Sequence, residues 1–190
     1  TVCDGATYNN IDDLFVMNTD GTEQTLLTRG SSATWSPDSK KLLFTDTHLR
    51  LWVVDIASGR VTQVDADQYM VPDRSMDPRW SPDSRWIAYT KRLATQLHVI
   101  YVHDTQSGRS TALTDGMSDA VAPAWDASGK HLWFLASTNF GLQTGWLDMT
   151  AYDRPSTRGV YMVILKKGEP SPFLPPLGDE AVTAAAPRPA

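Results

Sequence analysis

The chain has 190 residues, of which 41% are hydrophobic and 21% are charged, a balance typical of a soluble globular protein. Its formal net charge of −5 argues against nucleic acid or an anionic membrane surface as a partner, because phosphate binding requires a basic patch. A single cysteine, Cys3, excludes an intrachain disulfide, and no apolar run reaches the roughly 18 residues that a membrane span needs. We therefore expect a soluble protein, cytoplasmic or periplasmic, and the sequence does not distinguish these two compartments.

The first 28 residues contain two β-rich runs joined by a turn signal. The runs are Leu14–Met17 and Gln24–Thr28, and the pair Asp20-Gly21 lies between them. An Asp-Gly pair between two such runs favours a hairpin. We interpret residues 1–28 as the back half of a larger unit whose front half is missing or degraded.

A five-residue phrase then recurs along the chain. It reads WSPDS at Trp35–Ser39 and at Trp80–Ser84, and in degraded form WDASG at Trp125–Gly129. The interval is constant, since 80 − 35 and 125 − 80 both equal 45, and a period of this size indicates a repeat architecture. Each tryptophan is expected to end a strand and anchor neighbouring sheets, and each aspartate to accept hydrogen bonds in an Asx-type turn. The residues predicted to have these structural roles are Trp35, Asp38, Trp80, Asp83, Trp125 and Asp126.

Each phrase opens a unit of strand-like runs. Two apolar, β-branched or aromatic runs follow it, then a turn signal such as Ser58-Gly59 or Ser107-Gly108, and then a more polar run. Together with the residues that lead into the tryptophan, this predicts four antiparallel strands per unit, and such sheets arranged radially form a β-propeller. The predicted fold class is all-β: a β-propeller segment of four-stranded antiparallel blades, about three and a half in number, forming an incomplete propeller.

The expected organisation is a β-propeller segment over residues 1–175. Its blades would cover residues 1–28 (partial), 30–65, 75–115 and 120–175, and the last would close with a strand at Pro170–Leu174. Residues 176–190 are rich in alanine and proline, which predicts a linker or a disordered tail.

Two irregular segments contain the candidate contact residues. Asp65–Trp80 leads into an innermost strand, which lines the channel of a propeller, so its charges are expected to face a ligand or to form ordinary salt-linked channel lining. Ser137–Gly159 is an insertion; it is expected to contact a peptide, because long loops on rigid scaffolds often carry recognition, or to pack against a neighbouring blade or domain. The residues predicted to contact a peptide or a partner are Arg74, Asp77, Arg79, Trp146, Asp148, Tyr152, Arg154 and Arg158.

Sequence motifs for catalysis are absent. There is no GxSxG nucleophile elbow and no glycine-rich phosphate loop, and the four histidines show no metal-ligand spacing. We expect no catalytic residue, no metal and no cofactor in this chain, although a triad assembled across sequence distance would leave no such motif.

The repeat over residues 14–135 resembles the propeller repeats of TolB, of the prolyl-oligopeptidase relatives and of the tricorn proteases, and this pattern is specific for fold rather than function. Residues 122–180, above all the run STRGVYMVILKKGEPSPFLP, resemble the closing part of the second propeller of tricorn-type serine peptidases. The resemblance implies a non-catalytic propeller portion of a tricorn-like serine peptidase that contributes to peptide substrate access or domain assembly. It transfers no catalytic residue to this chain. The implied partners are peptides, the remaining domains of the parent peptidase, or a further copy of the chain that completes the propeller.

Two other functions stay open at the level of sequence. One is a stand-alone TolB-like module that binds a protein partner through its face. The other is an enzyme with a site on the propeller, as in glycan lyases or hydrolases, which would require a metal or a cluster of acids in the central channel.

Overall fold

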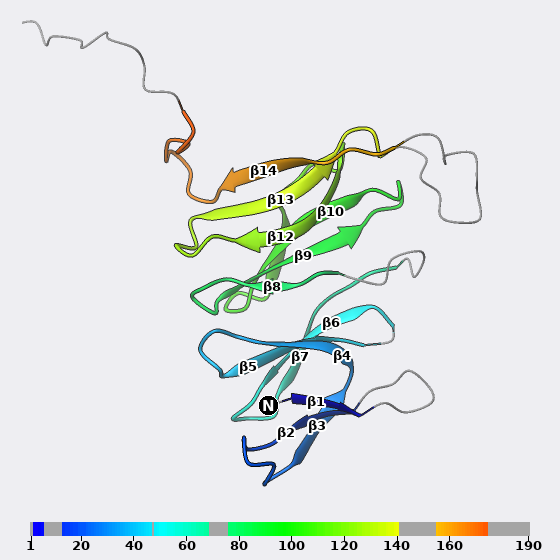
Figure 1. The fold of residues 1–190 in the computed structure, drawn as a ribbon, viewed down its shortest axis with the longest axis vertical. Coiled ribbons are helices and arrows are strands. Elements are labelled where there is room, and N and C mark those ends of the chain that lie inside the picture. The colour runs from blue at the N-terminus through cyan, green and yellow to red at the C-terminus, as the bar shows by residue number, and fades with distance from the viewer. Residues whose placement is uncertain (1, 6–12, 47, 69–75, 141–154, 175–190) are drawn as a thin grey trace, which may run out of the picture.

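The computed structural model describes residues 2–5, 13–46, 48–68, 76–140 and 155–174. Within these ranges the chain forms fourteen β-strands in four antiparallel sheets, which stack along the long axis of the molecule (Figure 1). In every sheet the strands pair in chain order, so each sheet is a simple meander. The predicted all-β class with antiparallel pairing is confirmed. No helix long and apolar enough to cross a bilayer occurs in the described ranges.

The strands have the following bounds. The first sheet contains β1 (Val2–Gly5), β2 (Asp13–Val16) and β3 (Thr25–Arg29). The second contains β4 (Ser31–Trp35), β5 (Lys41–Thr45), β6 (Arg50–Asp55) and β7 (Val61–Ala66). The third contains β8 (Arg79–Trp80), β9 (Trp86–Arg92), β10 (His98–Asp104) and β11 (Arg109–Ala112). The fourth contains β12 (Asp119–Trp125), β13 (His131–Ser137) and β14 (Gly159–Ile164).

Two details differ from the sequence-based expectation. Strand β1 was not predicted, and it adds a third strand to the first sheet, in register from Val2 opposite Val16 to Gly5 opposite Asp13. The prediction of a strand at Pro170–Leu174 was wrong, because these residues form turns and irregular backbone. Pro170 and Pro172 have no N–H group to donate to a ladder, which explains why this stretch does not continue the sheet.

The sheets are held together by apolar side chains from both faces of the middle strands. In β9, Ile87 and Tyr89 join the core shared with the second sheet, and Ala88 joins the core shared with the fourth; all three are fully buried. Because side chains alternate between the two faces of a strand, a strand buried on both faces must be apolar throughout. This burial explains the continuous run WIAYT, which lacks the alternation of a half-exposed strand.

The recurring tryptophan joins each sheet to the one before it. Trp80 ends β8, and its indole Nε1 donates to the carbonyl oxygen of Thr34 at 3.3 Å. Trp125 ends β12 and donates in the same way to the carbonyl oxygen of Arg79 at 3.1 Å. In both cases the acceptor lies 46 residues earlier, directly before the preceding tryptophan. The 45-residue period therefore repeats an inter-sheet contact as well as a local sequence.

The rest of the phrase forms a tight turn. In the first copy the Ser36 hydroxyl donates to Asp38 Oδ1 at 2.6 Å, and the backbone N–H of Lys40 donates to the same oxygen at 3.1 Å. These bonds hold the pKa of the exposed Asp38 carboxyl below its usual value. Ser39 adopts a left-handed φ of 58°, as does Ser84 at the same place in the second copy, with a φ of 60°.

The degraded third copy keeps this turn by exchanging the two polar residues. Asp126 directly follows the tryptophan, where the first copy has Ser36, and Ser128 stands where the first copy has Asp38. The Ser128 hydroxyl donates to Asp126 Oδ2 at 2.5 Å. Asp126 Oδ1 also accepts the backbone N–H of His131 at 3.0 Å, a bond that Ser36 Oγ accepts in the first copy. The hydroxyl-to-carboxylate bond is therefore present although its donor and acceptor have changed places.

This exchange makes a testable prediction. The variant Asp126→Ser should lower the melting temperature by about 2–5 °C, because the hydroxyl of Ser128 and the N–H of His131 lose a carboxylate acceptor. The double variant Asp126→Ser/Ser128→Asp should recover most of that loss by restoring the order found in the first two copies. Thermal unfolding followed by circular dichroism measures both. A double variant no more stable than the single one would show that the two residues do not act as an exchangeable pair.

Candidate functional site

Three of the eight predicted contact residues lie in the part of the chain that the structure describes. They are Asp77, two residues before β8, Arg79, the first residue of β8, and Arg158, directly before β14. The other five, Arg74, Trp146, Asp148, Tyr152 and Arg154, lie outside the described residues.

Arg79 belongs to a groove along the ends of the first strands of three consecutive sheets. This inner-edge groove has a volume of about 460 Å³ and is lined by the same positions of each repeat: the residue before the tryptophan, the tryptophan, and the residue two places after it. The lining residues are Thr34, Trp35, Pro37, Arg79, Trp80, Pro82, Ala124, Trp125, Asp126 and Ala127. The groove is thus a product of the repeat itself.

The charge of Arg79 is compensated locally. Its Nη2 lies 2.7 Å from Asp77 Oδ1, and the side chains of Arg79 and Asp77 are 54% and 33% exposed. The structure therefore brings the two candidate residues of this segment together as a partly solvated ion pair, of a kind that contributes little to stability.

The backbone before each tryptophan is bent in the same manner. Asp77 has a left-handed φ of 41°, and Ser32 and Ala122, which are also three residues before a tryptophan, have a φ of 55°. In β4 and β12 the pairing with the next strand shifts at this point, as in a β-bulge. A bulge redirects the side chains that follow it, and here the exposed residues that follow are those lining the groove: Thr34, Arg79 and Ala124.

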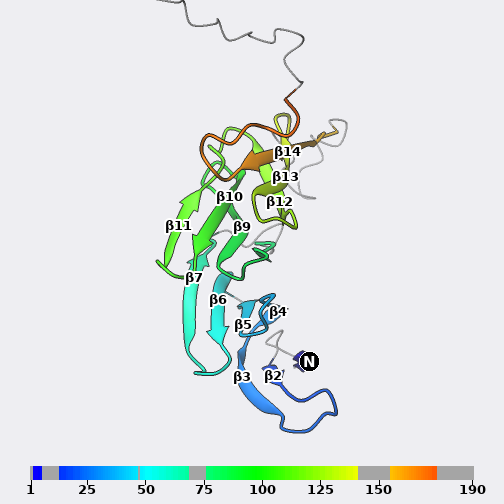
Figure 2. The ribbon, with the colours of Figure 1, turned by 90° about the vertical axis from the view of Figure 1, so that its left-hand side faces the viewer.

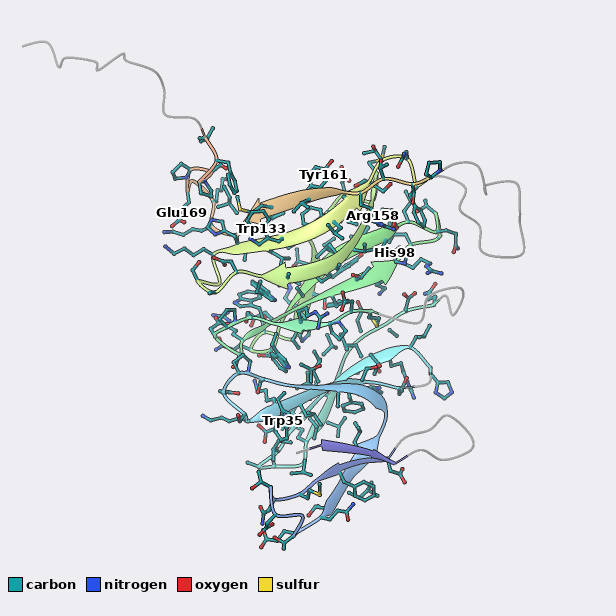
Figure 3. The ribbon with its side chains drawn as sticks, viewed as in Figure 1. Trp35, His98, Trp133, Arg158, Tyr161 and Glu169 are labelled. Carbon is teal, nitrogen blue, oxygen red and sulfur yellow. The ribbon has the colours of Figure 1, made fainter. Side chains whose placement is uncertain are left out.

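A second group of charges lies between the third and fourth sheets, and Arg158 is the one member of the group that is not buried. We call Arg92, His98, Asp119 and Arg158 the buried charge cluster. Asp119 begins β12 and is fully buried. Its Oδ2 lies 2.7 Å from Arg158 Nη2, and its Oδ1 accepts the backbone N–H of His98 at 2.9 Å. Figure 3 shows His98 and Arg158 near each other at the right-hand end of these sheets.

The hydrogen bonds of His98 define its tautomer. Arg92 Nε, which can only donate, lies 3.1 Å from His98 Nε2, so Nε2 must accept. The ring proton therefore sits on Nδ1, which is 2.6 Å from Asp119 Oδ1 and donates to it. This Asp-His arrangement superficially resembles a catalytic dyad, but Nε2 is occupied by Arg92, and both His98 and Arg92 are buried. The contacts of the cluster instead connect the third sheet, through Arg92 and His98, to the fourth sheet, through Asp119.

The cluster also sets the ionisation of its carboxylate. Burial alone would raise the pKa of Asp119, but the hydrogen bonds from the His98 ring, the His98 backbone and Arg158 outweigh burial and hold its pKa below the usual value. Asp119 is therefore an anion at neutral pH, compensated by Arg158, whose side chain is 27% exposed. Since Arg158 belongs to the insertion Ser137–Gly159, this ion pair fixes one end of the insertion to the first strand of its sheet.

The structure does not join the two candidate regions into one site. Asp119 and Trp125 lie at opposite ends of β12, about 20 Å apart at the usual rise per residue of a strand. Arg79 is beside Trp125, and Arg158 is beside Asp119. Asp119, Arg92 and His98 were not among the residues predicted from the sequence to form a site. No sequence motif links these residues. The one feature of the sequence that could have indicated them is a polar residue, His98 or Asp119, at the start of an apolar run.

Comparison with known proteins identifies the family of this chain. Residues 6–187 match the family model described as the tricorn protease second beta propeller domain. The chain is 28% identical over 178 residues to a tricorn protease homolog of Saccharolobus solfataricus, covering 91% of this chain and 16% of that protein. It is 30% identical over 105 residues to a putative tricorn-like protease C-terminal subunit of Sulfurisphaera tokodaii, covering 54% of this chain and 12% of that protein. The chain thus spans a small part of the length of these relatives.

Solved structures agree on the fold. The crystal structure of the tricorn protease matches with a TM-score of 0.66 and 20% identity, over 85% of this chain and 16% of that one. TolB from Acinetobacter baumannii matches with a TM-score of 0.54 and 18% identity, over 83% of this chain and 36% of that one. At these identities the two likenesses show the propeller fold alone. Together with the family match over 6–187, they confirm the predicted resemblance: this chain belongs to the family of the tricorn protease second β-propeller domain.

Proposed function

We propose that this chain is a non-catalytic β-propeller portion of a tricorn-like serine peptidase, and that it contributes to the access of peptide substrates. The inner-edge groove is the observation that carries this proposal. It runs over three consecutive sheets and is lined by equivalent residues of each. A groove that repeats along the inner strands offers similar contacts at each step, which suits an extended chain that slides past.

The chemistry of the groove favours passage over tight binding. Its exposed lining consists of one threonine, two prolines, two alanines and one arginine, and this arginine is paired with Asp77. These lining residues are Thr34, Pro37, Arg79, Pro82, Ala124 and Ala127. Specific ligand sites usually have an enclosed apolar pocket with a few fixed polar groups. The groove lacks such a pocket for one particular side chain, as expected for a path used by peptides of different sequence.

The alternative of a stand-alone TolB-like interaction module has no comparable support. The TolB likeness is a likeness of fold, with 18% identity. The family match over residues 6–187 favours a propeller that acts within proteolysis.

A photocross-linking experiment tests the proposal. p-Benzoylphenylalanine is introduced in place of Ala124 in the groove or, as the control, in place of Met117, which is 82% exposed and lies on the connection between the third and fourth sheets. Each variant is irradiated with an unstructured biotinylated dodecapeptide of mixed composition. We expect several-fold more cross-linked peptide at position 124, reduced by excess unlabelled peptide, and no cleavage of the peptide by mass spectrometry. Equal yields at the two positions would refute the peptide path, and cleavage would refute a non-catalytic role.

A further inference from the structure

The outer edge of the fourth sheet differs from the outer edges of the two sheets before it. In the second and third sheets a fourth strand, β7 or β11, covers this edge, and Figure 2 shows both along the same side of the stack. In the fourth sheet the outermost strand among the described residues is β14. Its sequence, GVYMVI, has no charge and no proline, and Val160 and Tyr161 are 68% and 47% exposed. An apolar strand of this kind at a sheet edge is a template for pairing with another strand.

The chain itself turns away from this edge after β14. The ring of Phe173 packs edge-on against Trp133, with centroids 5.8 Å apart. Leu132 and Phe134 face the third sheet, so the alternation of β13 places Trp133 on the opposite face. The chain at Phe173 therefore lies on the face of the fourth sheet that points away from the third sheet.

A largely apolar cleft lies between the third and fourth sheets, and its lining includes Leu165, the residue that directly follows β14. It has a volume of about 570 Å³, and its apolar walls include Trp86, Val102, Leu113, Trp125 and Leu165. All five belong to the hydrophobic core that joins the two sheets or pack against it. The cleft is therefore the open continuation of an established apolar interface.

The corresponding cleft between the second and third sheets shows what an outer strand does. That cleft, of about 470 Å³, is polar, and its lining includes Lys41, Asp55, Arg60 and His103. In the outer strand β11, Ser110 is the cross-strand neighbour of His103, and its hydroxyl lies 2.9 Å from His103 Nδ1. Since His103 lines the cleft, an outer strand places every second side chain on the face of its sheet that borders the cleft. A strand added to β14 would direct the equivalent side chains into the apolar cleft.

We propose that this edge and cleft form a docking site for an extended, proline-free polypeptide segment with apolar side chains at alternate positions. Its backbone pairs with β14 as a fourth strand, and every second side chain enters the cleft beside Leu113 and Leu165. Main-chain hydrogen bonds supply affinity, and the cleft supplies selectivity for aliphatic side chains, as in other cases of strand addition. The cleft shares Trp125 and Pro82 with the inner-edge groove, but β14, Leu113 and Leu165 do not line that groove, so either proposal can fail without the other.

Binding of a defined peptide tests the proposal on the full chain. The probe is a fluorescein-labelled heptapeptide of alternating valine and threonine, measured by fluorescence anisotropy. The matched probe has the same side chains but carries N-methyl groups on alternate residues, which removes the donors that a sheet edge requires. We expect the N-methylated peptide to bind at least tenfold more weakly. Equal binding of the two peptides overturns the proposal.

A pair of protein variants tests the cleft. Leu113→Asp places a carboxylate in the apolar cleft and should weaken binding of the unmodified peptide at least tenfold. The control Thr62→Asp places the same charge in the polar cleft and should leave binding unchanged. Circular dichroism establishes that both variants are folded, and the N-methyl comparison on the unaltered protein stands if Leu113→Asp is not. Unchanged binding by a folded Leu113→Asp overturns the proposal.

Two further outcomes identify other occupants, and each overturns the proposal. If the peptide binds only after Val182→Asp, the C-terminal segment of the chain occupies the edge. If light scattering shows a dimer that the peptide dissociates, a second copy of the chain does.

Discussion

The variant Asp119→Ala is expected to lower the free energy of unfolding by about 3–5 kcal/mol, the cost of breaking a buried ion pair by removing one partner. Asp119 is fully buried and accepts hydrogen bonds from the backbone and the ring of His98. Its removal leaves both donors and the Arg158 cation without their carboxylate. Urea unfolding followed by tryptophan fluorescence measures the loss. The control Asp115→Ala removes an exposed carboxylate that caps a turn near the same connection, and it should cost less than about 1 kcal/mol.

The same carboxylate makes stability depend on pH in a defined direction. Because its folded-state pKa is lowered, Asp119 stabilises the fold at pH values above its unfolded pKa of about 4, and this contribution is lost as the pH falls through the folded-state pKa. The variant Asp119→Asn cannot ionise, so its stability should fall less steeply than that of the unaltered protein below about pH 4. If the free energy of unfolding falls equally steeply with decreasing pH in the two proteins, Asp119 is not the cause of this pH dependence.

The variant Trp80→Ala is expected to cost about 3–5 kcal/mol, as truncation of large aromatic side chains in cores does. Trp80 is 8% exposed, packs in the core between the second and third sheets, and donates its indole N–H to the carbonyl oxygen of Thr34. Truncation therefore leaves a cavity between two sheets and one carbonyl without its donor. Urea unfolding gives the free energy, and the slope of the transition reports whether the sheets still unfold together.

Trp133 provides the matched comparison for Trp80. It is half-buried, and its aromatic partner Phe173 is 68% exposed. Trp133→Ala should therefore cost clearly less than Trp80→Ala. If the two variants lose equal stability, the position of Trp80 between two sheets does not account for its contribution to the free energy of unfolding.

The repeat was predictable because its causes are local. The Ser-Asp turn at Ser36–Asp38 closes through hydrogen bonds between residues at most five apart, so it reads directly from the sequence. The runs that follow it show the β-branched and aromatic residues of buried strands. The failed expectation at Pro170–Leu174 was also a local matter, since two prolines in five residues argue against a ladder partner.

What the sequence determined by itself was the unit: strand lengths, turn chemistry, the 45-residue period and the family resemblance. What only the tertiary structure decided was which units touch, and where. Asp119 meets His98 across 21 residues and Arg158 across 39, and Trp80 meets Thr34 across 46. The physical reason is that such contacts depend on how the sheets stack. Stacking is set by the shapes of whole apolar faces, and no single stretch of sequence records it.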